Sequence, residues 1–358
     1  MAEQEEPEII VGTPVDNAIY ERLGAQGFPR GLVDALIRNR TLFPRRIWII
    51  DNSGSMRRRD GQKLVQRGSG DDLFFRECTR WEELTETVSY HVGLAGILNA
   101  HTTFRLLNDQ NGRTGSDEFS VAREEGVDID ADLYKAKSMM RDAAPNGYTP
   151  LVHHVKKIIK DIEIIAPSLR QSGQKIAVII ATDGSPSDGS KSEFVTYLKG
   201  LHHLPVWIVF RLCTNEDSVV DYFGDLDKLL EQPVEVLDDY VAEAEEIHKK
   251  NRWINYILPL HRSREVGFKH PLFDLIDERL LTKDEVFEYC ELLFGEEAMK
   301  NCPAAASDWG KFKDFIGSLN KSTNMCWNPI MKKPTPLIDV DLLSIQYDEA
   351  LDGCCNVC

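Results

Sequence analysis

Oxygen-bearing side chains follow a short apolar run at residues 47–50. The run ends abruptly in Asp51-Asn-Ser53-Gly-Ser55, which places one carboxylate and two hydroxyls at alternate positions. Gly54 allows a tight turn, and such a turn can direct all three side chains into one hollow. Ligands that are all oxygen suit a hard cation such as Mg²⁺, which keeps its waters where the protein does not reach. This segment therefore predicts one part of a divalent-cation site.

Similar apolar runs occur at residues 176–181 and 206–210. Runs this short are typical of strands buried on both faces of a parallel sheet. Segments with helical spacing lie between and after them, and the clearest carries Leu151, Val155, Ile158, Ile162 and Ile165. Strands that alternate with helices predict an α/β fold, with a doubly wound, mainly parallel sheet and helices on both faces.

Ligand sites in such sheets form in the crevice beyond the carboxyl ends of the strands. The run at 176–181 is followed by Thr182-Asp183-Gly184, so Asp183 is expected at the same edge as Asp51. Hydroxyl ligands bring no charge. A cation that is held by two carboxylates, with one or both acting through water, remains under-neutralised and favours an acidic group from a partner. The sequence therefore predicts a receptor for a carboxylate.

The Asp-x-Ser-x-Ser loop after the first strand resembles the von Willebrand factor A (VWA) domain with its metal-ion-dependent adhesion site (MIDAS), here in an intracellular protein. The resemblance implies a threonine from a later loop, matched by Gly147-Tyr-Thr149, and an aspartate after a later strand, matched by Asp183. It implies that the hydroxyls reach one Mg²⁺ ion, or else Mn²⁺ or Ca²⁺, directly or nearly so, and that the carboxylates act mainly through water. The implied metal residues are Asp51, Ser53, Ser55, Thr149 and Asp183.

Composition and spacing divide the chain into five expected parts. Residues 1–16 are an acidic, flexible leader, 17–43 a short helical segment, 44–250 the VWA domain, 251–325 a helical extension, and 326–358 an extended tail with a terminal cysteine cluster.

Two local expectations belong to this division. Three amphipathic helices are expected within the extension, near Leu272–Leu281, Val286–Leu293 and Trp309–Leu319. The stretch Asn108–Asp132, rich in Asn, Gly, Ser and acid, is expected to be an inserted surface loop with at most one short strand.

The charge balance excludes some classes of partner. Lys and Arg number 42 against 58 Asp and Glu, and the net charge of -16 disfavours nucleic acid.

The apolar runs are far shorter than the roughly 20 residues that a membrane-spanning helix needs. Acidic residues stand where a signal peptide would be basic, so a cytoplasmic location is expected.

Two weaker signals leave alternatives open. Arg57, Arg58 and Arg59 follow the metal loop and either form a rim that steers an acidic ligand or belong to a solvated loop. The terminal Cys355-Asn-Val-Cys358 fits a prenylation box, with Cys354 beside it as a palmitoylation site. Lipid on Cys354 or Cys355 would give peripheral membrane attachment, while the alternative is a reactive tail or half of a metal pair.

Three functions are compatible with these patterns. The favoured one is a non-catalytic, divalent-cation-dependent module that binds an acidic residue of a protein partner. A metal-assisted hydrolase with Asp51 as nucleophile or base is less favoured. The three loops that carry the implied metal residues, at 51–55, 147–149 and 182–184, contain no His or Glu that could act as an acid or base. The third is an accessory subunit of ubiquitin or membrane-traffic machinery, which rests on the amino-terminal helices alone.

Overall fold

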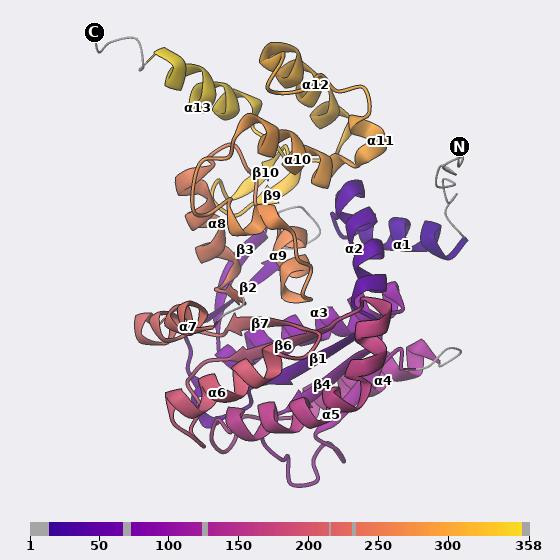
Figure 1. Ribbon diagram of the computed structural model, residues 1–358, viewed down its shortest axis with the longest axis vertical. Coiled ribbons are helices and arrows are strands. Elements are labelled where there is room, and N and C mark those ends of the chain that lie inside the picture. The colour runs from indigo at the N-terminus through magenta and orange to yellow at the C-terminus, as the bar shows by residue number, and fades with distance from the viewer. Residues whose placement is uncertain (1–13, 67–72, 124–127, 215, 231–233, 353–358) are drawn as a thin grey trace.

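A six-stranded sheet organises the first part of the chain (Figure 1). The computed structural model describes residues 14–66, 73–123, 128–214, 216–230 and 234–352. Neighbouring strands are parallel except for the edge pair β4 and β5, which is antiparallel. The strands, in spatial order, are β5 (Glu118–Val121), β4 (Thr102–Leu106), β1 (Arg45–Ile50), β6 (Ile176–Thr182), β7 (Val206–Leu212) and β8 (Glu235–Leu237).

Helices cover both faces of this sheet. Alternate side chains of β1 point to opposite faces, so Trp48 packs in a core with α3 (Arg80–Leu98) and α4 (Ile129–Asp142). Ile49 packs in a second core with α5 (Leu151–Ser172), α6 (Lys191–His202) and α7 (Asp217–Leu229). Every residue of β6 and β7 is buried, which is why these strands are continuous apolar runs. The predicted doubly wound α/β fold is confirmed.

Several elements between the predicted strands were not expected. A two-stranded antiparallel hairpin, β2 (Gly61–Gln66) and β3 (Leu73–Cys78), follows the short 3₁₀ turn η1 (Gly54–Arg57). The predicted insertion Asn108–Asp132 contains one short strand, as expected, and this strand, β5, forms the antiparallel edge of the sheet. The helix α4, which begins at Ile129 within the same range, was not expected.

The amino-terminal helices share a core with the carboxyl-terminal part of the chain. The helical segment expected at residues 17–43 is present as two helices, α1 (Pro14–Gly24) and α2 (Arg30–Leu42), and α2 packs on α10 (Lys283–Phe294). Leu32 and Leu36 belong to the same apolar cluster as Tyr289 and Leu293. The predicted flexible leader falls mostly on residues 1–13, which lie outside the described part of the chain.

The carboxyl-terminal elements gather at one end of the molecule (Figure 1). Besides α10 they are α8 (Tyr240–Lys250), α9 (Leu258–Glu265), η2 (Pro271–Asp274), α11 (Glu296–Met299), α12 (Trp309–Ser322), the hairpin β9 (Cys326–Asn328) and β10 (Lys333–Thr335), and α13 (Val340–Asp352). No helix among the described residues is long and apolar enough to cross a membrane.

Two expectations for this part were wrong. The predicted helix near residues 272–281 is only the short turn η2, because its apolar residues cluster without a sustained helical face. The predicted extended tail contains a hairpin and α13. The prolines of this segment, which favoured an extended tail, end at Pro336, and α13 begins beyond them. The Asp339 carboxylate caps its first turn and accepts from Leu342 N at 2.9 Å.

A close backbone approach joins the carboxyl-terminal elements to the sheet. Gly267 follows α9 with φ +81°, and a Cβ atom at this position would lie 2.8 Å from Cβ of Ala177 in β6. Arg46 in β1 donates from Nε to the carbonyl of Val266 at 3.1 Å. The helical extension is therefore packed directly on the Trp48 face of the sheet.

Candidate metal centre

The first carboxylate lies at the end of β1. The register pairs Ile50 with Ala181, so the segments that follow β1 and β6 emerge side by side. Asp51 is buried, and its Oδ1 accepts from the backbone N–H of Ser53 at 2.8 Å. Its Oδ2 accepts from the Thr182 hydroxyl at 2.6 Å. The side chain is thus held in one orientation by both strand ends.

A chain of polar contacts connects this loop to the second carboxylate. The hydroxyl oxygens of Ser53 and Ser55 are 3.0 Å apart. The Ser55 hydroxyl donates to Oδ1 of Asp183 at 2.8 Å, across the gap between the two strand ends. Ser53 and Asp183 are both buried. The structure therefore brings Asp51, Ser53, Ser55 and Asp183 together, as their sequence positions predicted.

The loop that carries Thr149 packs against the loop after β1. Gly54 N donates to the carbonyl of Gly147 at 3.2 Å, and Asn146 N donates to the carbonyl of Asn52 at 2.6 Å. Gly147 has φ +66°, a conformation that favours glycine, and a Cβ atom there would lie 2.6 Å from Asn108 Oδ1. Thr149 itself is buried, at 8% exposure.

The backbone on the other side of Thr149 is also fixed. Its N–H donates to the Ser187 hydroxyl at 3.0 Å, and its carbonyl accepts from Ser187 N at 2.9 Å. The short segment from Gly147 to Thr149 is therefore held from both sides, next to the Ser53 and Ser55 loop.

Burial dominates the electrostatics of this cluster. Desolvation raises the pKa of Asp51 to about 6, and the nearby charge of Asp183 contributes to that rise. Hydrogen bonds from Thr182 and Ser53 oppose the shift. Since desolvation and a neighbouring carboxylate both penalise the ionised form, the site favours a positive charge beside Asp51.

The donor set fits a hard divalent cation. It consists of two carboxylates and three hydroxyls, all oxygen, which is the chemistry that Mg²⁺ prefers. The described residues contain no group of three or more His, Cys, Asp or Glu side chains that could hold a metal. Any ion at this site would therefore depend on the hydroxyls and on water to complete its coordination.

Arg80 is the charged neighbour that the sequence did not reveal. It begins α3, directly after the N-cap residue Thr79, which forms a capping box with Glu82, and only 1% of the Arg80 side chain is exposed. Its Nη1 donates to Oδ2 of Asp183 at 3.0 Å. Nothing in the spacing around Arg80 signals this contact, because the two residues meet only in the folded chain.

The proposed arginine rim is partly committed to other contacts. Arg57 donates from Nη2 to the carbonyl of Pro145, and Arg58 forms an ion pair with Glu216. These contacts leave the steering role of Arg57, Arg58 and Arg59 as a prediction. The lipidation candidates Cys354 and Cys355 lie outside the described residues.

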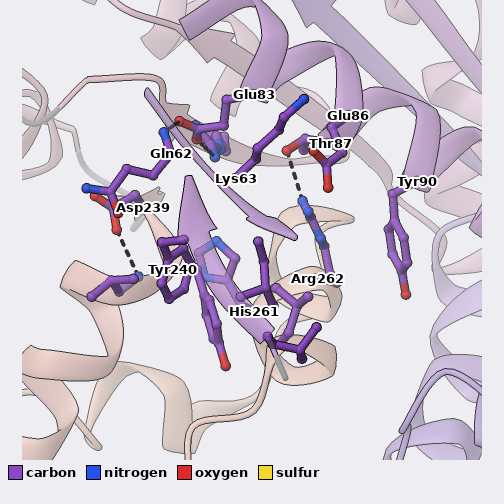
Figure 2. A pocket seen from close by; sticks show the side chains of 16 residues that line it. Gln62, Lys63, Glu83, Glu86, Thr87, Tyr90, Asp239, Tyr240, His261 and Arg262 are labelled. Atoms are coloured by element: carbon purple, nitrogen blue, oxygen red, sulfur yellow. Dashed lines mark hydrogen bonds and ion pairs between the residues drawn. The ribbon is translucent and has the colours of Figure 1, made fainter. Parts of the chain in front are cut away.

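A separate cavity of about 340 Å³ lies between the β2 and β3 hairpin, α3 and the carboxyl-terminal helices (Figure 2). Figure 2 shows Tyr240, His261 and Arg262 on one side and Glu86, Thr87 and Tyr90 on the other. Arg262 Nη1 donates to the Thr87 hydroxyl at 3.0 Å across this space. None of the five predicted metal residues lines the cavity.

Comparisons with known proteins give fold-level similarity only. No model of a protein family matches the sequence, and no curated protein matches it. Part of the chain is similar to the manganese-loaded TRAP protein of Plasmodium vivax, at 13% identity and a TM-score of 0.34, over 55% of this chain and 69% of that chain. It is also similar to the VWA domain of SpRpn10, at 12% identity and a TM-score of 0.33, over 55% and 87%. At such values neither likeness bears on the metal or the partners of this chain.

Proposed function

We propose that this chain is a non-catalytic, divalent-cation-dependent protein-interaction module. A MIDAS would bind one Mg²⁺ ion, or alternatively Mn²⁺ or Ca²⁺, and the ion would accept a carboxylate from a protein partner. One observation carries the proposal: two buried carboxylates and two serine hydroxyls, from the ends of two neighbouring strands, form one connected cluster. The residues that would hold the ion are Asp51, Ser53, Ser55, Thr149 and Asp183.

The charges of this cluster support an acidic ligand. Three of the five side chains are neutral hydroxyls, so two carboxylates at most balance a divalent ion. Arg80 already pairs with one of them, Asp183, at 3.0 Å. The ion would therefore retain attraction for a further carboxylate, which a partner can supply.

The same contacts argue against a hydrolase. Both carboxylate oxygens of Asp51 accept hydrogen bonds, which lowers their nucleophilicity. An acidic side chain from a neighbouring loop, Glu216, is paired with Arg58 and Arg80, and hydrogen bonds from these arginines lower its pKa. A carboxylate whose pKa is lowered is a weaker general base at neutral pH. A binding role therefore fits this arrangement better than catalysis.

We also propose a cytoplasmic location and lipid attachment at Cys354 or Cys355, on the sequence patterns described above.

The test is a capture experiment from cell extract with the full chain as bait. The baits are the wild type, the double variant Asp51→Ala and Ser53→Ala, and the matched control Asp142→Ala, which removes a carboxylate of α4 outside the cluster. Each bait is used in Mg²⁺ and in chelator. We expect partners retained by the wild type and the control only in Mg²⁺, and lost by the double variant. The same partners in every condition would show that the metal site is not the contact surface.

A further inference from the structure

Arg80 is unusual for a residue at the start of a helix. A positive side chain there meets the positive end of the helix dipole of α3, which disfavours it. The side chain is nevertheless buried, with 1% exposed. Buried charges persist in proteins when they are paired and hydrogen-bonded. The partners of Arg80 therefore explain why it stays there.

Three carboxylates from three different segments surround the guanidinium. Asp60 accepts from Nε at 2.7 Å and from Nη2 at 2.5 Å. Asp183 accepts from Nη1 at 3.0 Å, and Glu216 accepts from Nη2 at 2.5 Å. Only Asp183 among these also belongs to the proposed metal cluster. Arg80 thus connects the metal residues to the segment before β2 and to the loop before α7.

The three carboxylates do not neutralise Arg80 equally well. The side chain of Asp183 is fully buried, whereas those of Asp60 and Glu216 are 49% and 40% exposed. Water and salt screen exposed charges far more than buried ones. The buried charges that an ion at the site would meet are therefore two carboxylates and one guanidinium, which together carry one net negative charge.

We propose that Arg80 is a fixed counter-charge of the metal site, which weakens cation binding by itself and couples cation binding to capture of an anionic ligand. This inference rests on the proposed function. With a divalent ion bound, the buried group carries one net positive charge and attracts a carboxylate. Without Arg80 the same loaded site is neutral, and the attraction for a carboxylate falls. The ion and the acidic ligand then support each other's binding, since coupling between two ligands is reciprocal.

The competing explanation is that Arg80 has a purely structural role, in which its hydrogen bonds hold the segments of Asp60, Asp183 and Glu216 together. The two roles predict opposite results for a neutral residue of similar length. Arg80→Met removes the charge and keeps much of the volume. A counter-charge therefore predicts tighter cation binding by this variant, and a purely structural role predicts weaker binding. Arg80→Lys keeps the charge and loses the planar fork of donors. A counter-charge therefore predicts nearly unchanged cation binding by this variant, and a purely structural role predicts weaker binding.

The expected size follows from Coulomb's law. Even in a water-like dielectric, which sets the lower limit for a buried charge, a unit charge at roughly 7 Å from a divalent ion changes the affinity for the ion by about tenfold. We therefore expect Arg80→Met to bind Mn²⁺ more tightly than the wild type, by about tenfold or more. Arg80→Lys is expected within about threefold of the wild type, because the charge is kept.

The experiment measures free Mn²⁺ by electron paramagnetic resonance during titration of the purified full chain, with and without acetate as the carboxylate probe. Acetate is expected to tighten Mn²⁺ binding in the wild type and in Arg80→Lys, and to do so less in Arg80→Met. Weaker or unchanged Mn²⁺ binding by folded Arg80→Met would overturn the counter-charge. Circular dichroism melts of each variant establish that it is folded.

Asp51→Ala separates this inference from the proposed function. Equal Mn²⁺ binding by the wild type and Asp51→Ala would refute the metal site itself and the role of Arg80 with it. A clear loss in Asp51→Ala together with no gain in Arg80→Met would refute the counter-charge alone. If Arg80→Met does not fold, Asp60→Asn replaces it. That change leaves Arg80 less neutralised and is expected to weaken Mn²⁺ binding about twofold or more, and unchanged binding would overturn the inference.

Discussion

The contact between Gly267 and the sheet gives the sharpest prediction for stability. Gly267→Ala combines two penalties at one position. A non-glycine residue in the left-handed region costs about 1–2 kcal/mol, and Gly267 has φ +81°. The added Cβ would also lie 2.8 Å from the Cβ of Ala177, and overpacking of this kind costs about 1–3 kcal/mol. We expect a loss of about 2–5 kcal/mol in the free energy of unfolding.

Two other glycines provide matched controls for the same substitution. Gly173 has φ +67°, and a Cβ atom there would have no described atom within 4 Å, so Gly173→Ala should show the backbone penalty of about 1–2 kcal/mol alone. Gly224 lies inside α7, where an added Cβ would likewise meet no described atom within 4 Å, and Gly224→Ala should stabilise by about 0.5–1 kcal/mol. The three variants therefore separate backbone strain, steric contact and helix propensity.

The assay is urea unfolding, followed by far-ultraviolet circular dichroism and by tryptophan fluorescence to show whether the two probes change together. The double variant Ala177→Gly and Gly267→Ala removes the steric contact and should recover about 1–3 kcal/mol relative to the sum of the single changes. If Gly267→Ala costs no more than Gly173→Ala, the carboxyl-terminal elements do not approach β6 this closely.

Three further predictions follow from particular side chains. Burial lowers the pKa of His91 from 6.5 to about 4, so the fold favours the neutral ring. The neutral ring therefore contributes about 3 kcal/mol to the free energy of unfolding above pH 6.5, and this contribution is lost as the pH falls toward 4. The difference between the urea midpoints at pH 7 and pH 4.5 should therefore be smaller in His91→Gln than in the wild type. Tyr148, 80% exposed beside the metal loops, should contact the partner, so Tyr148→Ala should reduce partner capture while Mn²⁺ titration stays unchanged. Asp183→Ala should destabilise more than Asp51→Ala in thermal melts, by about 1–3 kcal/mol, because Arg80 loses its buried partner; equal losses would contradict that pairing.

Local patterns in the sequence determined three of the six strands of the sheet and the clearest of the helices that cover it. Strands β1, β6 and β7 are apolar at nearly every position that both faces bury, so their runs were visible without any partner. The helical spacing of α5 was equally clear, because one face of it packs on the sheet. Asp51, Ser53 and Ser55 were identifiable because they immediately follow such a strand, where an α/β sheet forms its sites.

Elements whose form depends on distant contacts were not predictable. The hairpin of β2 and β3 has partly exposed, mixed side chains and no strand-like apolar run. Helix α13 buries Leu343 and Tyr347, but the three prolines before it suggested an extended tail. Its stability depends on tertiary contacts, such as the hydrogen bond from the Tyr347 hydroxyl to the carbonyl of Leu281 at 2.5 Å.

The charged residues of the candidate site show the same difference between what local sequence patterns predict and what tertiary contacts decide. The order of strands in the sheet was enough to bring Asp183 toward Asp51, because adjacent parallel strands end at one edge. Arg80 belongs to a helix that starts beyond an unexpected hairpin, and only the packing of α3 on the sheet brings its guanidinium to Asp183. Side-chain types and spacing thus determined which oxygen atoms the site has. Tertiary packing alone decided the buried positive charge beside them, since a long-range ion pair leaves no periodic signal in the sequence.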